Sequence, residues 1–379
     1  MSERVVVVGA GIIGLAIGHR LARSGWKPII MDPNPPCHGA SAAALGSLTP
    51  YSDDACTPVT RELARNSVAK YPEWLDELYA ATGIRVSYSS SGLFEIALSR
   101  SAAEQLATKA KAFQAAGLPV RLLPVADARA LEPHINPRTA AVLFYEDEPS
   151  VDLQQLLLAC ESATRAAGCV ISQGQRVHSV VVSDGEVAGV QTQGGITPGR
   201  YVVIAAGDAS PSIAGVPHFE LQRVRGEVIE VAGAPGMVGR HLYSGDGFIT
   251  PRTDGRLLLG STYDVQMPCD DERRDTVSVG NASLILRATQ RMVPAIANFQ
   301  IRRVWKGWRA RTADHQPILG PGGPRGMYFA TGLYGLGITL APAVADLVSE
   351  SLSDPNSVPR ELLVDRFSAV ERARKGERI

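Results

Sequence analysis

The sequence has few cysteines, and they form no recognisable pattern. The five cysteines among 379 residues are odd in number, widely separated and never spaced C-x-x-C. This distribution argues against a disulfide framework and a structural zinc site, and it suits a reducing cytoplasm. The seven histidines show no metal-ligand spacing either, so we expect no bound metal. The cysteines are Cys37, Cys56, Cys160, Cys169 and Cys269.

Long apolar runs and an excess of one charge are also missing. No segment holds the ~18 consecutive apolar residues that a transmembrane helix needs. Lysine plus arginine equals aspartate plus glutamate at 38 each, so no overall field attracts nucleic acid or an anionic membrane. The apolar start lacks a basic leader and is expected to form part of the fold rather than a signal peptide. A chain of 379 residues exceeds what one core usually supports, so two domains are expected.

What the sequence does contain is a glycine-rich turn at its start, in "RVVVVGAGIIGLAIGHRLARSG". Gly9, Gly11 and Gly14 follow a buried strand and open an amphipathic helix, and Asp32 ends the next apolar run. Gly9 permits the tight turn, Gly11 lets backbone approach a pyrophosphate, and Gly14 allows close packing of helix on strand. The helix N-terminus favours the anion, and Asp32 can accept hydrogen bonds from ribose hydroxyls. This context favours a dinucleotide-binding unit over a plain βαβ unit whose glycines serve only in packing. The acidic residue favours NAD or FAD over NADP.

Further along the chain, periodicity and turn residues predict alternating helices and strands. Asp152 is a predicted helix N-cap, and Ser101 with Glu104 forms a predicted capping box. Asp184-Gly185 predicts a β-hairpin turn, and residues 219–262 and 301–312 read as strands. Helices are expected over 66–83, 101–117, 150–168 and 281–294.

A second glycine-rich turn lies near the C-terminus, where "MYFATGLYGLGITLAP" reads as strand, turn and helix. Gly332, Gly335 and Gly337 would let backbone N–H groups approach the flat polar edge of a ligand. A flavin ring, which lies far from its adenine, fits such a second site. The alternative is a glycine C-cap followed by a tight turn.

Several blocks together resemble the glycine oxidase (thiamine-pathway) branch of the D-amino acid oxidase superfamily. They are "VVGAGIIGLAIGHRLARSG", "GASAAALGSLTP", "YVVIAAGDAS", "RVRGEVIEV", "FITPRTDGRLLLGST", "WKGWRARTADHQPILG" and "ATGLYGLGITLAPAVADLVSESL". The blocks cover nearly the whole chain in the order of the family. The resemblance implies an α/β fold with a discontinuous Rossmann-like FAD-binding domain and a mixed-sheet α+β substrate-binding domain. The FAD domain is expected over 1–83, 148–217 and 312–379, and the substrate domain over 84–147 and 218–311.

The resemblance also implies which residues bind FAD. The block "GASAAALGSLTP", residues 39–50, resembles the flavin loop of the family. Members that bind flavin covalently through this loop carry a histidine where this chain has Ala42, so we expect non-covalent FAD. His38, upstream in the same loop, is an alternative attachment point. The cofactor residues implied are Gly9, Gly11, Ile13, Gly14, Asp32, Ser41, Ala43, Gly46, Val177, Gly207, Gly332, Gly335, Leu336, Gly337 and Ile338.

Arg309 matches the arginine that binds the substrate carboxylate in the family. Arginine suits this role because its planar guanidinium binds a carboxylate through two parallel hydrogen bonds. In a strand, Arg309 shares a face with Gly307, which would leave space beside it, whereas Lys306 points the other way, toward the surface. Hydride transfer from the substrate Cα to flavin N5 needs positioning and a neutral amine rather than a protein acid or base.

The predicted pocket departs from glycine oxidases on the carboxylate side. Phe248 stands where the family has a tyrosine, and Gly335 where it has a second arginine. Asp246 lies near the position of a pocket histidine and would favour a substrate with an additional cationic group. Tyr334 could restore a lost contact, as could Tyr243 and Tyr263. A larger and more apolar pocket follows, so free glycine is not expected to be the best substrate.

The leading interpretation is therefore an FAD-dependent oxidase or dehydrogenase of an amino acid or secondary amine. Its imine product would hydrolyse to a 2-oxo acid, and the electron acceptor would be oxygen or another compound. An NAD dehydrogenase shares only the first motif. A non-catalytic flavoprotein subunit of a hetero-oligomer is a third possibility, favoured by the missing contacts and opposed by Arg309. A homo-oligomer is also compatible with the sequence.

Overall fold

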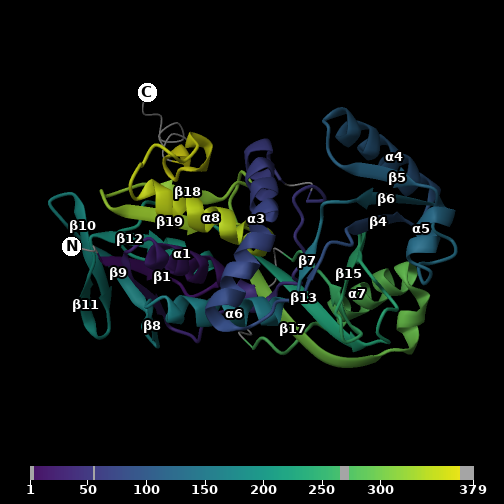
Figure 1. Ribbon diagram of the computed structural model, residues 1–379, viewed down its shortest axis with the longest axis horizontal. Helices are drawn as coiled ribbons and strands as arrows, with labels where there is room; N and C mark the ends of the chain where they lie inside the picture. Colours follow the sequence, from purple (N-terminus) through teal and green to yellow (C-terminus); the bar gives the residue numbers. More distant parts are fainter. Residues whose placement is uncertain (1–3, 54–55, 265–272, 368–379) are drawn as a thin grey trace.

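The computed structural model describes residues 4–53, 56–264 and 273–367, which form two units that lie side by side (Figure 1). The first unit is built on a six-stranded sheet and the second on an eight-stranded sheet. Within the described residues, no helix is both long and apolar enough to cross a bilayer. The α/β class with two sheets, as expected from the sequence, is confirmed.

The six-stranded sheet is parallel except at one edge, where β18 pairs antiparallel with β19. Val5 and Val7 of β1 pack against helices on one face, and Val6 and Val8 pack on the other face, so the strand is apolar throughout. In spatial order the strands are β18 (Ile318–Pro321), β19 (Met327–Thr331), β12 (Tyr201–Ile204), β1 (Arg4–Val8), β2 (Lys27–Asp32) and β8 (Val170–Gln173).

Helices cover one face of this sheet and a small second sheet covers the other. The helices are α1 (Ile12–Arg23), α3 (Pro58–Thr82), α6 (Leu153–Ala166) and α8 (Gly337–Ser351). The small sheet contains β9 (Val177–Ser183), β10 (Glu186–Thr192) and β11 (Gly195–Pro198). The glycine turn connects the end of β1 to the start of α1, so it lies at the carboxyl edge of the sheet. Short elements complete the unit: α2 (Ala40–Ala43), β3 (Tyr88–Ser89), β7 (Ser150–Val151), η1 (Gly207–Ser212) and η3 (Arg360–Leu362).

The eight-stranded sheet is antiparallel except where β14 pairs in parallel with β4. Phe94 and Ile96 pack in a cluster with α7, whereas Leu93 and Ala97 pack in a cluster with α4. Its strands, in order, are β17 (Gln300–Arg311), β13 (Gln222–Ala232), β16 (Arg256–Gly260), β15 (Gly247–Pro251), β14 (His241–Ser244), β4 (Leu93–Ala97), β6 (Ala141–Tyr145) and β5 (Val120–Leu123). The helices are α4 (Arg100–Ala115), α5 (Val125–Leu131), α7 (Val279–Met292) and η2 (Pro294–Asn298).

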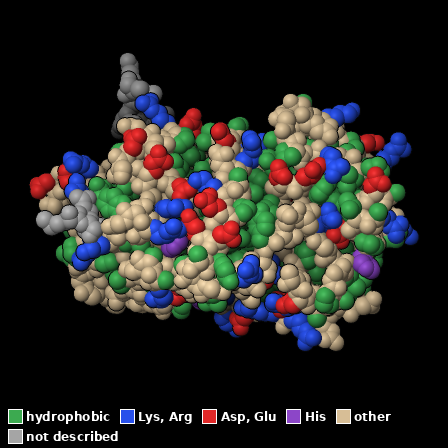
Figure 2. Space-filling view, in the orientation of Figure 1, with side chains coloured by type: hydrophobic (Ala, Val, Ile, Leu, Met, Phe, Trp, Pro, Cys, Tyr) green, Lys and Arg blue, Asp and Glu red, His purple; other side chains and the backbone are tan. Residues whose placement is uncertain are grey.

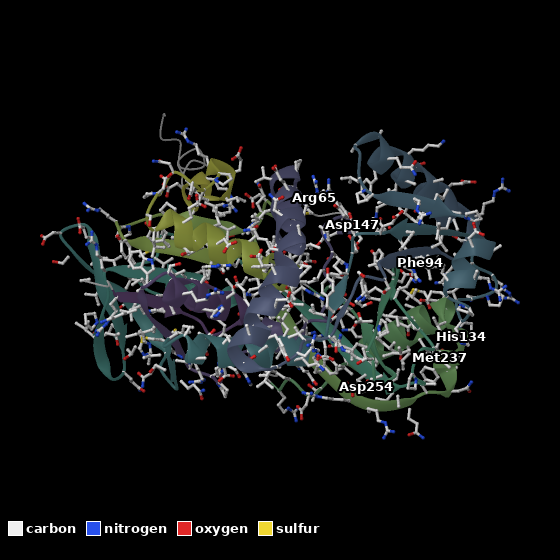
Figure 3. All side chains as sticks on the ribbon, in the orientation of Figure 1. Arg65, Phe94, His134, Asp147, Met237 and Asp254 are labelled. Atoms are coloured by element: carbon white, nitrogen blue, oxygen red, sulfur yellow. The ribbon has the colours of Figure 1, made fainter. Side chains whose placement is uncertain are left out.

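The long edge strand β17 and its neighbour β13 bring this sheet against the first unit (Figure 1). Strand β17 contacts α2 and η1 of the first unit. Figure 3 labels Arg65 and Asp147 near the junction of the units, and Phe94, His134 and Met237 within the second. The chain crosses between the units several times, so residues distant in sequence meet at this junction.

Local signals in the sequence predicted one helix cap and one hairpin turn correctly, and they misplaced the starts of two helices. The Asp152 carboxylate accepts a hydrogen bond from the Gln155 N–H at 3.1 Å, which confirms it as N-cap. Asp184 and Gly185 both have positive φ, as the predicted hairpin turn requires. The capping box at Ser101 was wrong, because Ser99 caps α4 by accepting from the Ala102 N–H at 3.2 Å. Helix α3 also begins earlier than predicted, at Pro58, and α7 ends at Met292.

Candidate active site

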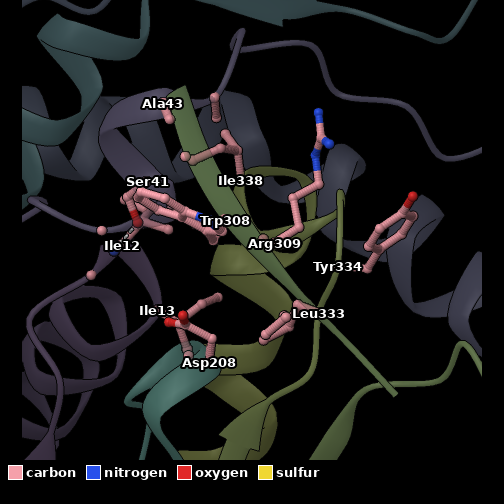
Figure 4. Close-up of a pocket in the computed structure, with 18 of the residues that line it drawn as sticks. Ile12, Ile13, Ser41, Ala43, Asp208, Trp308, Arg309, Leu333, Tyr334 and Ile338 are labelled. Carbon is pink, nitrogen blue, oxygen red and sulfur yellow. Dashed lines mark hydrogen bonds between the residues drawn. The ribbon is translucent and has the colours of Figure 1, made fainter. Parts of the chain in front are cut away.

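A cavity of about 590 Å³ lies between the two units. Its walls come from the carboxyl edge of the six-stranded sheet, the loop over residues 39–49, the end of β17 and the turn before α8. Figure 4 shows Ile12, Ser41 and Ala43 on one side of this cavity and Arg309 and Tyr334 on another. On the face drawn in Figure 2, positive and negative side chains are interspersed.

The first glycine turn is shaped for close packing and for an anion. Gly9 has φ +111, and a Cβ there would lie 2.4 Å from the Ala205 carbonyl oxygen. A Cβ on Gly14 would lie 1.9 Å from the Gly9 carbonyl oxygen, so Gly14 packs helix on strand and does not line the cavity. Gly9, Gly11 and Ile13 do line it.

Asp32 lies at the end of β2 and lines the cavity. Its carboxylate accepts hydrogen bonds from the backbone N–H groups of Ala10 at 2.8 Å and Asn34 at 2.7 Å. Each carboxylate oxygen has a further lone pair, so Asp32 can still accept from a ribose hydroxyl. Val177 and Gly207 line the cavity as well.

The loop over residues 39–49 is held in place from both units. Ser41 Oγ accepts from the Ile12 N–H at 3.0 Å, in the first turn of α1. The buried guanidinium of Arg252 in the second unit donates to the Leu45 carbonyl at 3.0 Å and the Val151 carbonyl at 3.1 Å. Gly46 has φ +83, and a Cβ at this position would lie 2.4 Å from the carbonyl oxygen of Val151. Ser41, Ala43 and Gly46 all line the cavity.

The second glycine turn also reaches the cavity, through Gly332, Gly335, Gly337 and Ile338. Leu336, expected from the sequence to lie at the cofactor, is not among the residues that line the cavity. Its side chain is 5% exposed and packs in the core, and its N–H donates to the Leu333 carbonyl at 2.9 Å.

These walls fit FAD. Helices α1 and α8 begin beside the cavity. Neither helix has an acidic residue in its first turn, and in neither does the side chain of the N-cap residue accept a hydrogen bond from the helix. Their N–H groups and partial positive charges therefore suit a pyrophosphate at one helix and a polar ring edge at the other. Glycines at both turns leave room for close backbone contact, as an extended dinucleotide requires.

Arg309 projects from β17 between Ile338 and Tyr334 (Figure 4). Its guanidinium donates to the Thr262 carbonyl at 3.0 Å and to Ser261 Oγ at 2.5 Å, and it lies 4.8 Å from the Tyr263 ring centroid. Within the described part of the chain, no carboxylate forms an ion pair with it. A half-buried, oriented guanidinium of this kind is suited to bind a carboxylate from a ligand.

The space around Arg309 comes from the neighbouring strand. A Cβ on Gly226 of β13 would lie 2.7 Å from both terminal guanidinium nitrogens of Arg309. Gly307, expected to provide this space, instead faces the flavin loop, where its Cβ would lie 2.4 Å from Ala43 Cβ. Lys306 was also misplaced, because it is 5% exposed rather than at the surface.

Aromatic rings surround the Arg309 end of the cavity. Tyr263 and Tyr334 have ring centroids 6.4 Å apart, and Tyr243 and Phe248 have centroids 5.8 Å apart. All four rings line the cavity, together with Trp308. Burial raises the pKa of Tyr334, so its phenol remains a neutral hydrogen-bond donor.

Asp246, predicted near the pocket, does not line this cavity. It lies in the turn between β14 and β15 with its side chain 75% exposed, and its carboxylate is 3.6 Å from Arg291. Sequence reasoning instead missed Asp53, which does line the cavity. Asp53 is the first of two adjacent aspartates in the sequence, and no spacing signal distinguishes them. Arg274, also missed, lines the cavity and donates to the Gly39 carbonyl at 3.0 Å.

None of the described cysteines lines the cavity, and His38 does not line it either. Burial raises the pKa of Cys37 and Cys56 to about 12, so both thiols are protonated and unreactive. Cys160 and Cys169 are buried too, and Cys269 lies outside the described residues.

Comparison with known proteins agrees with this site. Residues 4–351 match the DAO family, described as FAD dependent oxidoreductase. The glycine oxidase of Geobacillus kaustophilus (strain HTA426) is 29% identical over 351 residues, 91% of this chain and 92% of that protein. A crystal structure of glycine oxidase from Geobacillus kaustophilus superposes with a TM-score of 0.88 at 26% identity, covering 96% of this chain and 99% of that one.

A second kind of relative is longer than this chain. The bifunctional protein ThiO/ThiG of Trichormus variabilis (strain ATCC 29413 / PCC 7937) is 26% identical over 363 residues. The match includes 95% of this chain and 54% of that protein, so the chain spans about half its length. The expected likeness to glycine oxidases is thereby confirmed, and an NAD dehydrogenase is excluded. The chain belongs to the DAO family of FAD-dependent oxidoreductases, as an enzyme of its glycine oxidase-like branch.

Proposed function

We propose that this enzyme oxidatively deaminates an amino acid or secondary amine whose carboxylate binds Arg309. The observation that carries the proposal is the Arg309 guanidinium, which faces the cavity and is oriented by Thr262 and Ser261 without an ion-pair partner among the residues described. A bound carboxylate would complete the hydrogen bonding of this guanidinium through two parallel bonds.

The residues of the cavity hold the substrate in position. When bound, FAD supplies the hydride acceptor. Arg309 fixes one end of the substrate, and the partly buried rings of Tyr334 and Phe248 lie beside it. A substrate held in this way presents one Cα–H in a fixed direction, which lowers the entropic part of the barrier. The partly buried rings also favour the neutral form of the amine, which hydride transfer requires.

Free glycine is not the preferred substrate in this proposal. Phe248 lines the cavity without a hydroxyl. Gly335 leaves open space, because Asp53 is the one described residue outside its chain neighbours within 4 Å of its Cβ position. A larger side chain or an N-alkyl group can fill this space, at up to about 0.8 kcal/mol per buried methylene. Comparing kcat/KM for glycine, N-alkyl glycines and larger D-amino acids tests this point, and a clear preference for glycine would contradict it.

The carboxylate role is tested with Arg309→Gln and Arg309→Lys. We expect both proteins to retain FAD and to show KM raised by roughly tenfold to a hundredfold, since a charge-assisted hydrogen bond is worth about 1.5–3 kcal/mol. Lysine should rescue little because it cannot form the two parallel bonds. A KM within about twofold of the parent would show that the substrate carboxylate binds elsewhere.

We further propose that FAD is bound non-covalently, that oxygen is the electron acceptor and that the enzyme works in the cytoplasm, with a homo-oligomer as one possible assembly. Ala42 in place of a histidine supports dissociable FAD, and unpaired buried cysteines support a reducing compartment. Reducing the flavin anaerobically with substrate and then admitting air tests the acceptor. Failure of the flavin spectrum to return within the turnover time would favour another acceptor.

A further inference from the structure

Asp53 faces the same end of the cavity as Arg309. Both residues line it, and Asp53 Oδ2 lies 3.7 Å from the Cβ position of Gly335. Among the described residues, no other atom outside the chain neighbours of Gly335 is within 4 Å of that position. The glycine that stands in place of a second arginine therefore opens the cavity toward a carboxylate.

Tyr334 lies within the fields of both charges. Burial raises the pKa of its phenol, Arg309 lowers it, and Asp53 raises it again. Tyr263 lies against the Arg309 guanidinium on one side and near Tyr334 on the other. One end of the cavity thus carries a cation and an anion, each close enough to Tyr334 to shift the pKa of its phenol.

The loop that carries Asp53 is anchored immediately before and after it. The buried carboxylate of Glu148 accepts hydrogen bonds from the Tyr51 N–H at 2.8 Å and from the N–H and hydroxyl of Ser52, each at 2.6 Å. The Asp53 carbonyl accepts from the Cys56 N–H at 3.1 Å. Asp53 is therefore presented to the cavity by a fixed backbone.

We propose that Asp53 is a specificity-determining residue that selects substrates bearing a second cationic group in addition to the reacting amine. The proposal rests on the proposed function, because it takes the substrate carboxylate to be bound by Arg309. A carboxylate beside the reacting amine would hold that amine protonated and oppose hydride transfer. A second cationic group, remote from the reacting carbon, gains the ion pair without this cost, and phenol rings add cation–π attraction.

Binding of unreactive carboxylates to the FAD-loaded protein tests this selection without turnover. One probe is γ-trimethylammoniobutyrate, and its control is the isosteric acid in which carbon replaces the quaternary nitrogen. A second pair, based on ε-trimethylammoniohexanoate, covers a longer separation of the two charges. None of the four has an oxidisable α-amine. Isothermal titration calorimetry should show at least one cationic acid binding roughly fivefold or more tightly than its neutral isostere.

Two variants locate the source of this preference. Asp53→Asn removes the charge, and Gly335→Arg places a tethered cation beside Asp53, at a position whose backbone accepts a side chain. We expect the ratio of affinities to fall severalfold in both, which leaves only the preference that the phenol rings provide. Gly335→Ala is the matched control for added volume, and Asp246→Asn for loss of one exposed negative charge from the second unit. Both controls should keep the preference.

The outcomes separate this inference from the proposed function. Carboxylates that bind in an Arg309-dependent manner, with equal affinities for cationic and neutral members in both pairs, would overturn the role of Asp53 alone. Carboxylates that bind equally well to the Arg309→Gln protein would overturn both. If Asp53→Asn does not retain FAD, Gly335→Arg decides, and a preserved preference in that protein refutes the inference.

Discussion

Replacing Gly226 with alanine should move the guanidinium of Arg309 while leaving the fold intact. The added Cβ would lie 2.7 Å from both terminal nitrogens and 2.8 Å from Cζ of Arg309. Ordinary contacts of this kind need about 3.5 Å or more, so the guanidinium must shift by on the order of 1 Å. Since Gly226 lies in β13 without positive φ, its backbone accommodates alanine without strain.

A shift of that size disrupts the bonds that orient Arg309. The contacts to Thr262 and Ser261, at 3.0 and 2.5 Å, would lengthen or lose their alignment. Losing one well-aligned charge-assisted bond to a carboxylate costs about 1.5–3 kcal/mol, which corresponds to roughly tenfold to a hundredfold in Kd. The melting temperature should change little, because the clash falls on the flexible end of a side chain.

Gly307→Ala is the matched comparison, because Gly307 is the cross-strand partner of Gly226. Its Cβ would lie 2.4 Å from Ala43 Cβ, which has no flexible side chain and belongs to the flavin loop. This variant should therefore lose FAD affinity first. We would measure Kd for FAD, Kd for an aliphatic carboxylate and the melting temperature of all three proteins. Parent-like carboxylate binding by Gly226→Ala would refute the role assigned to Arg309.

Three further predictions concern the cofactor and pH. Acid precipitation should release all of the flavin to the supernatant, and colour left in the pellet would reveal a covalent bond. Gly9→Ala should abolish FAD binding, because φ +111 and a contact of 2.4 Å with the Ala205 carbonyl oxygen exclude a side chain; an unchanged Kd for FAD would contradict this. Burial raises the pKa of Glu148 to about 7, against hydrogen bonds from Ser52 and Tyr51 that lower it. The Glu148 carboxyl then binds its proton more tightly in the folded state than in the unfolded state. Its contribution to the free energy of unfolding is therefore fully present below about pH 4.5 and is lost as the pH rises to about 7. The difference in unfolding free energy between the parent and Glu148→Gln should fall across that window, and a constant difference would show that Glu148 titrates normally.

The sequence determined features that depend on residues close together in the chain. The turn from Gly9 to Gly14 needs glycines for its own backbone and for the helix packed on it, so its pattern is readable without a structure. The Asp152 cap and the Asp184-Gly185 turn are local in the same sense. Resemblance of blocks along the whole chain added Arg309, whose role depends on position within a family rather than on spacing.

Tertiary structure decided which residues meet around Arg309. Asp246 lies nearer to Phe248 in sequence than Asp53 does, yet a turn at the end of β14 directs it to solvent. Asp53 reaches the cavity because buried Glu148, from a distant segment, fixes the loop before it. Gly226 rather than Gly307 makes room for Arg309, because the pairing of β13 with β17 sets which neighbour lies beneath the guanidinium. Local pattern specifies backbone conformation, but contacts between segments far apart in the chain depend on strand register and loop anchoring, which only the folded chain defines.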